Sequence, residues 1–240
     1  MGDDWLGFGG ATAASGCYGR AVSTGRRFRV IHESNRTSRY QIYFTKIHPS
    51  VPLIHRPRFM AALDLAPHMR PPVCLRYSMW TLAACVTDKY NGLQQHFYHR
   101  ARKYAQLDEM RGHGESTLTL AHCQAWALMC TYEFKTMYFP RAWLSCGRAV
   151  GLAQMMQLHR LDGAGLDVKQ CLPPPKDWTE REERRRTFWI CFAMDRYASI
   201  GTGWPMTIDE RDVSCRSSRD IQPINTSSDH DEPPCQRRRV

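Results

Sequence analysis

The stretch from Glu180 to Val213 constrains the fold of this chain more than any other. It begins with alternating charge, continues through the seven apolar residues Phe188–Met194, and then reaches Asp195–Arg196, two glycines and Trp204–Pro205. This order is typical of one long helix that starts at the surface, docks into a core and is ended by Gly and Pro. Because every position of the central run is apolar, we expect this helix to be buried on all sides. The other segments are then predicted to surround it.

Apolar residues recur at helical spacing through most of the chain before this stretch. Strand-like alternation is almost absent between residues 40 and 205, and no repeat of roughly 30–45 residues is visible. The sequence therefore predicts an all-α, multi-helix bundle or array of about six helices, preceded by a disordered segment at residues 1–37 and followed by a disordered tail at 214–240. Helices are expected from Ser38, from Pro57, at residues 73–90, 93–110, 117–138 and 141–158, and from Thr179, which forms a capping box with Glu182.

The net charge of +10 raises the question of nucleic-acid binding. Residues 1–39 hold six arginines against three acids, residues 216–240 hold five against four, and the rest of the surplus lies between them. An excess spread this thinly is a weak electrostatic bias and not a basic stripe. We therefore do not expect direct nucleic-acid contact to be the main role of this chain.

The N-terminus and the cysteines indicate the compartment. Asp3 and Asp4 stand where a secretory signal would be basic and then apolar. Leu6 occupies the position where the myristoylation pattern requires Ser or Thr. No apolar run approaches the roughly 20 residues of a membrane span. Ten cysteines form no CxxC pair, and most lie in apolar helical stretches, where a free thiol behaves as a small apolar side chain. We expect an intracellular, reduced and soluble protein.

Two histidine patterns could carry chemistry. His96 and His99 lie three apart on one predicted helix, and the same helix carries an apolar face and a basic face that includes Arg102. No carboxylate or thiol is placed to complete a zinc site with them, so we interpret them as solvated or packing residues. His122 and Cys123 are adjacent, and neighbours on a helix point about 100° apart, so we do not expect a catalytic pair.

Charged and glycine-containing patterns also have structural interpretations. Gly112-x-Gly114 and Gly163-x-Gly165 lack the third glycine and the preceding strand of a phosphate-binding loop. Arg184–Arg186 follows three glutamates on the same helix, which indicates a self-paired, solvated face. Asp195–Arg196 is interpreted as a structural pair that orders the helix end. The sequence thus predicts no catalytic, cofactor-binding or metal-ligating residue.

Three separated motifs resemble the fungal-specific transcription factor domain, also called the middle homology region. Tyr43–Phe59 is similar to its opening, Y-F-x-x-x-H-P-x-x-P-x-x-H-R-P-x-F. Residues Ala142–Leu161 look like its A-x-x-L-A-x-x-L-x-L-H-R segment, and EERRRTFWICFAMDRYASIGTGWPMTIDERDV resembles its long helix and the segment after it. The matched positions are His48, Pro49, Pro52, His55, Arg56, Pro57, Phe59, Phe188, Trp189, Asp195, Arg196, Gly203, Pro205, Ile208, Asp209, Arg211 and Asp212.

The resemblance implies an all-α regulatory domain at residues 38–213, nuclear and dimeric, that modulates transcription through a small-molecule effector or protein partners rather than through catalysis. In this family DNA is bound by a separate module of six cysteines and two zinc ions. Only Cys17 precedes Cys74 here, so neither zinc nor DNA contact transfers to a residue of this chain, and DNA is expected to be reached only indirectly. No membrane association is expected.

The sequence also departs from the family pattern. Trp204 stands where the family usually has Arg, and the residues after Cys215 do not look like its continuing helices, so we expect a truncated or differently spliced fragment. Two alternatives follow. One is a dominant-interfering fragment that binds the partners of a full regulator without reaching DNA. The other is a helical enzyme whose pocket residues come from several helices, which no motif supports.

Overall fold

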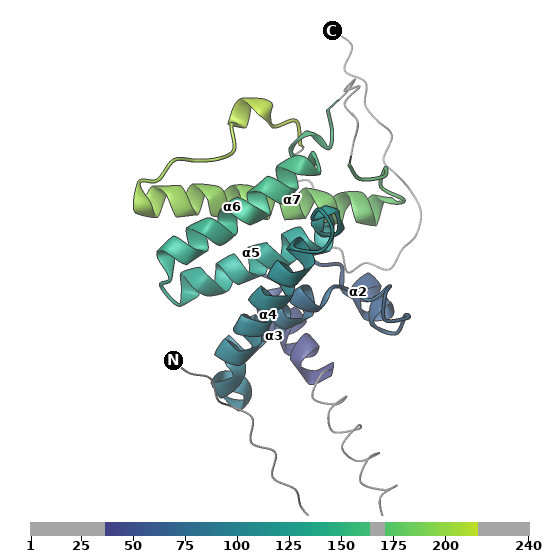
Figure 1. Cartoon of the computed structure of the whole chain (residues 1–240), viewed down its shortest axis with the longest axis vertical. Coiled ribbons are helices and arrows are strands. Elements are labelled where there is room, and N and C mark those ends of the chain that lie inside the picture. Colours follow the sequence, from purple (N-terminus) through teal and green to yellow (C-terminus); the bar gives the residue numbers. More distant parts are fainter. Residues whose placement is uncertain (1–36, 164–170, 216–240) are drawn as a thin grey trace, which may run out of the picture. The chain divides into compact units, whose positions relative to one another are not determined.

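The computed structural model describes residues 37–163 and 171–215 (Figure 1). Over this range the chain consists of helices and loops and contains no strand, which confirms the all-α prediction. Arg39 and the described residues after it belong to one packing unit. The segments predicted to be disordered lie almost wholly outside the described residues, so that part of the domain assignment stays a prediction.

The helices follow one another with short connections. Residues 37–42 are helical and continue as a π-helix, η1 (Tyr43–Ile47). Then come α2 (Arg56–Leu63), α3 (Val73–Cys85), η2 (Asp88–Leu93), α4 (Gln94–Glu109), η3 (Glu115–Thr117), α5 (Leu120–Lys135), α6 (Phe139–Met155), η4 (Leu158–Arg160), α7 (Trp178–Thr202) and η5 (Glu210–Asp212).

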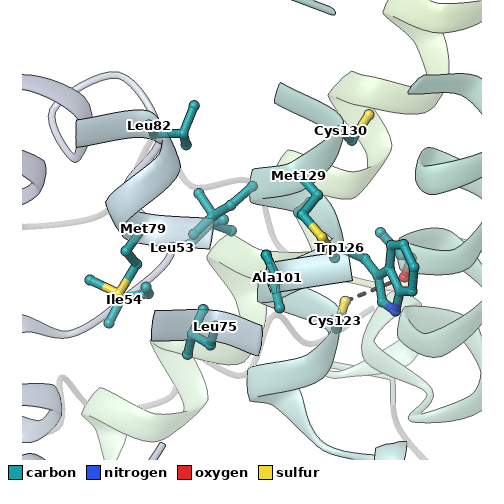
Figure 2. Packing of buried hydrophobic residues seen from close by; sticks show 14 of the residues in the cluster. Leu53, Ile54, Leu75, Met79, Leu82, Ala101, Cys123, Trp126, Met129 and Cys130 are labelled. Carbon is teal, nitrogen blue, oxygen red and sulfur yellow. Dashed lines mark hydrogen bonds between the residues drawn. The ribbon is translucent and has the colours of Figure 1, made fainter. Parts of the chain in front are cut away.

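Helix α5 is the centre of the core. Eleven of its sixteen residues are buried, including the unbroken run His122–Cys130, so it is surrounded on all sides. It packs most extensively against α6 and α3 and also contacts α7 and α4, and Figure 1 shows it between α6 on one side and α3 and α4 on the other. Figure 2 shows part of the resulting cluster, formed by residues such as Leu53, Leu75, Met79, Leu82, Trp126 and Met129.

Helix α7 is not buried on all sides, so this prediction was wrong. Within Phe188–Met194 only Phe188 and Cys191 are buried, and Ala193 is exposed. Charged residues in the first half of the helix are buried instead, among them Glu182 and Arg185. The cause is position: α7 packs mainly against α6 and along part of α5, so these helices cover only part of its surface. Ion pairs make burial of the charged half tolerable.

Two helix ends differ from those expected. Helix α3 stops at Cys85 rather than Tyr90, because the chain turns extended at Thr87 (φ −144°, ψ 122°), which follows Val86 as the second of two adjacent β-branched residues. Helix α7 begins at Trp178, one residue before Thr179, because the N-cap is Asp177, whose carboxylate accepts a hydrogen bond from the Glu180 amide at 2.7 Å. The expected capping box does not form, and Glu182 binds arginines instead.

Small side chains hold α5 and α6 close together. The Cys123 thiol donates to the Ala149 carbonyl and the Cys130 thiol to the Ala142 carbonyl, each at 3.3 Å. Gly147 and Gly151 do not contribute, because a Cβ added at either would meet nothing within 4 Å.

Candidate functional site

A cleft of about 580 Å³ opens between α2, the 64–72 loop, the start of α3, the end of α4 and the start of α5. This volume lies within the range of small-molecule sites. One wall is apolar and is built by the core residues Ile54, Phe59 and Leu75 together with the prolines of the loop. The remaining lining residues are Arg58, Ala62, Pro67, His68, Met69, Arg70, Pro71, Pro72, Val73, Arg76, Asp108, Arg111, Ser116, Thr119, Ala121, His122, Gln124 and Glu183.

Four guanidinium groups face this cleft against two carboxylates. Arg58 pairs with Asp177 outside the cleft at 2.6 Å, and the Arg70 Nε donates to the Leu65 carbonyl. Arg76 differs from them, because its Nε is buried and has no hydrogen-bond partner among the described residues. Such a group is costly unless something satisfies it. The cleft therefore has a positive bias and one buried donor without a partner.

Glu183 closes the inner end of the cleft from α7. Its Oε1 accepts from the His55 amide at 3.2 Å and from the Gln124 side chain at 3.3 Å. Burial raises the pKa of the Glu183 carboxyl, and these two hydrogen bonds only partly oppose that shift.

A second polar cluster lies on the α3–α4–α5 side. The Sγ of Cys74, a carboxylate oxygen of Asp108 and a ring nitrogen of His122 all lie within 4.8 Å of one another. The His122 Nε2 is 3.3 Å from the Asp108 Oδ2, and its Nδ1 is 2.7 Å from the Thr119 hydroxyl. Burial, with a smaller contribution from Asp108, raises the pKa of the Cys74 thiol to about 12, so the thiol is neutral at pH 7.

The two histidine patterns agree with their structural interpretations. His96 and His99 are exposed on α4. His122 points to Asp108, whereas Cys123 points to Ala149 and to Cys191, so the adjacent pair does not act together. The Cys74–Asp108–His122 cluster has no signal in the sequence, because its members come from three helices and form no local motif.

The arginine cluster is self-paired but not solvated. Arg184 pairs with Glu180 at 2.6 Å, and Arg185 and Arg186 both pair with Glu182, which is fully buried. Arg185 also pairs with Asp162 at 2.7 Å. The expected solvated face was therefore wrong, because these charges form an interior network.

Asp195 and Arg196 order the chain after α7, as predicted. The buried Asp195 carboxylate accepts from the backbone amides of Thr207 and Ile208 at 3.1 Å. Arg196 donates to Asp195 at 3.0 Å and to the Ile208 carbonyl at 2.8 Å. The pair thus fixes the segment that returns along the helix.

The three sequence motifs meet around α7. The His55 amide of the first motif binds Glu183 of the third. The His159 carbonyl, in the second motif, accepts from the Ser214 amide at 2.8 Å, just after the end of the third, and Arg160 pairs with Asp212 at 3.4 Å. These contacts show that the motif positions hold the fold together.

Among the described residues, the helices enclose a cleft whose volume suits a small molecule. The chain belongs to the family of the fungal specific transcription factor domain, which it matches over residues 40–237. The family resemblance seen in the motifs is thereby confirmed, and the chain is a transcription-regulator domain and not an enzyme.

Relatives with known roles are fungal transcriptional regulators. The chain is 37% identical over 178 residues to the pigment biosynthesis transcriptional activator pigB of Monascus ruber, covering 73% of this chain and 32% of that protein. It is 32% identical over 176 residues to the citrinin biosynthesis transcriptional activator ctnR of Monascus purpureus (73% and 30% covered). It is 28% identical over 173 residues to the tropolone cluster transcription factor tropK of Talaromyces stipitatus (72% and 30% covered). The chain spans about a third of the length of these relatives. No solved structure matches it.

Two further observations bear on partners. No helix in the described ranges is long and apolar enough to cross a membrane. Such regulators carry a zinc module of six cysteines, and the described cysteines of this chain do not fit that module. Thiols do meet in the core, such as Cys123 and Cys191 at 3.7 Å, but the described cysteines form no cluster of six. No step of the function proposed below is therefore assigned to that module.

Proposed function

We propose that this chain is the regulatory domain of a nuclear activator of a fungal biosynthetic gene cluster, and that its cleft binds an apolar small molecule carrying a carboxylate. The relatives named as activators of pigment and citrinin biosynthesis support the first part. The cleft supports the second, because it combines an apolar wall with four guanidinium groups.

The buried Nε of Arg76, which has no hydrogen-bond partner among the described residues, is the observation that supports a carboxylate ligand. A carboxylate matches the planar fork of a guanidinium group. The core residues Ile54 and Phe59 offer apolar surface to the rest of the molecule. A neutral primary amide can accept only through its one carbonyl oxygen and without charge assistance, so acids are favoured over their amides.

Isothermal titration of the purified chain with a panel of aromatic and aliphatic carboxylic acids tests this ligand class. Each acid is paired with its neutral primary amide. A charge-assisted hydrogen bond contributes about 1.5–3 kcal/mol, so Arg76→Gln should weaken acid binding about 10–150-fold. Arg148→Gln removes a half-exposed arginine that does not line the cleft and should leave binding unchanged. Equal binding of acids and amides, or equal effects of the two variants, would refute the assignment.

A reporter assay tests the regulatory role separately. The full chain, fused to a heterologous DNA-binding domain, should change transcription of a reporter in a fungal host, and an acid that binds in vitro should alter that output. Arg76→Gln should make the fusion insensitive to the acid. A fusion that never changes reporter output would refute the regulatory role even if ligand binding is confirmed.

Gel-shift of the unfused chain tests the expectation that this chain reaches DNA only indirectly. Tight, salt-sensitive binding of the chain to DNA would contradict that expectation.

Protein contact is the second candidate mechanism, and exposed apolar side chains at one end of the molecule favour it. Tyr197 is 64% exposed and Ile200 is 78% exposed near the end of α7, and Phe134 contacts both Tyr197 and Phe139. Contiguous apolar surface of this kind marks interaction sites. We assign it to a second copy of the chain.

Sedimentation of the chain tests this homodimer. A concentration-dependent dimer should be lost in Ile200→Glu and kept in Met69→Glu, which places the same charge at an exposed residue lining the cleft. A chain that stays monomeric at all concentrations would exclude the homodimer. It would also remove the basis for a fragment that interferes by pairing with a full regulator.

A further inference from the structure

We infer that Cys74, Asp108 and His122 form a binding site for one Zn²⁺ ion. This inference does not depend on the cleft ligand or on the regulatory role. Thiolate sulfur, imidazole nitrogen and carboxylate oxygen are the donor types that zinc prefers, and they are poor matches for Mg²⁺ or Ca²⁺ as a set. The described residues contain this one group of three or more such donors at metal-binding separations.

The separations suit a tetrahedral ion. With zinc–nitrogen and zinc–oxygen bonds of about 2.0–2.2 Å, two ligands at the tetrahedral angle lie about 3.3–3.5 Å apart. The His122 Nε2 and Asp108 Oδ2 are 3.3 Å apart without any adjustment. The Cys74 Sγ lies within 4.8 Å of a ring nitrogen of His122 and of a carboxylate oxygen of Asp108, and a zinc–sulfur bond of about 2.3 Å calls for about 3.6 Å. A movement of about 1.2 Å therefore suffices to close the set.

Neighbouring groups already hold two of the ligands in a metal-binding orientation. The Thr119 hydroxyl lies 2.7 Å from the His122 Nδ1 and can accept its proton, which leaves the Nε2 lone pair directed at the ion. Arg111 contacts the Asp108 Oδ1 at 3.3 Å and leaves Oδ2, the oxygen nearest His122, for the ion. Ligands of zinc are commonly oriented by such outer contacts.

Charge and burial are consistent with an occupied site. Zinc binding replaces the Cys74 proton, which leaves to solvent, so the thiolate and the Asp108 carboxylate together neutralise the two positive charges of the ion. Cys74 is fully buried, whereas Asp108 and His122 line the cleft. Three protein ligands leave a fourth position, as in zinc sites that accept water or an outside donor.

Metal analysis of the full chain tests the site. The chain is stripped with a chelator, dialysed against Zn²⁺ and analysed for bound metal, and a parallel sample is loaded with Co²⁺. We expect one ion per chain, and in the Co²⁺ sample a thiolate-to-metal charge-transfer band. Cys74→Ser should abolish that band, and Cys123→Ser should retain it, because Cys123 neighbours His122 in sequence but points to Ala149.

Further variants separate ligation from folding. Asp108→Asn changes a partly exposed residue and keeps the shape of the side chain, and it should lose stoichiometric zinc while its circular dichroism matches the parent. Thr119→Val should weaken zinc roughly 10–100-fold, and Thr119→Ser, which keeps the hydroxyl, should not. At zinc concentrations about 100 times the dissociation constant, the parent should melt roughly 5–10 °C higher than the stripped chain.

Clear outcomes would overturn the inference. These are a stripped chain that takes up no zinc, a charge-transfer band that persists in Cys74→Ser, or a zinc-dependent rise in melting temperature that survives in Asp108→Asn. None of these results bears on acid binding in the cleft when the acid titrations use chain stripped of metal with the same chelator.

Discussion

Removing Arg102 should destabilise the fold far more than its sequence context suggests. Arg102 reaches from α4 to Glu133 on α5, where its Nη1 lies 2.6 Å from the carboxylate oxygen Oε1. The Glu133 side chain is completely buried, and Arg102 retains 18% exposure. The Tyr98 hydroxyl also donates to Glu133, and Ser145 lies 3.1 Å from the same Arg102 nitrogen.

Breaking a buried ion pair from one side typically costs about 3–5 kcal/mol, because the remaining charge is left uncompensated. We therefore expect Arg102→Met to lower the free energy of unfolding by about 3–5 kcal/mol. For a domain of this size that corresponds to a fall of roughly 6–20 °C in melting temperature. The second oxygen of Glu133 has no hydrogen-bond partner among the described residues, so little else is in place to stabilise the charge.

Urea unfolding followed by circular dichroism measures this effect, with two comparison variants. Lys103→Met removes the adjacent exposed charge and should change stability by less than about 0.5 kcal/mol. The double variant Arg102→Met/Glu133→Gln removes both charges and should recover most of the loss. If Arg102→Met costs no more than Lys103→Met, the buried-charge reasoning is refuted.

The remaining predictions concern α7. Asp195→Ala removes the carboxylate that accepts from Arg196 and from two backbone amides. It should lower the free energy of unfolding by roughly 3–5 kcal/mol and speed hydrogen exchange at the Thr207 and Ile208 amides. Unchanged exchange at these amides would contradict the anchoring role. Glu183→Gln should stabilise the chain at pH 7. The folded-state pKa of Glu183 is raised, so its stabilising contribution is complete below the unfolded pKa near 4.3 and is lost as pH rises through the folded pKa. Unfolding titrations of parent and variant from pH 4 to 8 should converge at the acid end, and a variant less stable at pH 7 would disprove this.

The sequence predicted the helical class and the main helices because apolar spacing depends on each segment alone. It did not predict which helix is central. The continuous apolar run of Phe188–Met194 suggested α7, but α5 is surrounded because of where its neighbours pack. Local spacing also placed Arg102 on a basic face opposite the apolar one, whereas the approach of Glu133 from α5 turns that side chain inward. Long-range pairing of this kind leaves no trace in the spacing of either helix.

The family motifs contribute only part of the candidate site. The cleft is lined by Ile54, Arg58 and Phe59 of the first motif and by Glu183 of the third. Contacts between motifs, such as Glu183 with His55 and Arg160 with Asp212, hold the neighbouring segments against α7 and the residues that follow it. In contrast, Arg76 and the Cys74–Asp108–His122 cluster come from α3, α4 and α5 and lie outside all three motifs. Substitution of these groups would therefore leave the motif contacts in place while changing what the cleft binds. A regulatory fold can in this way be retained while its ligand varies. Recognition of the family depends on the contacts that join the motifs, so family membership does not identify the ligand.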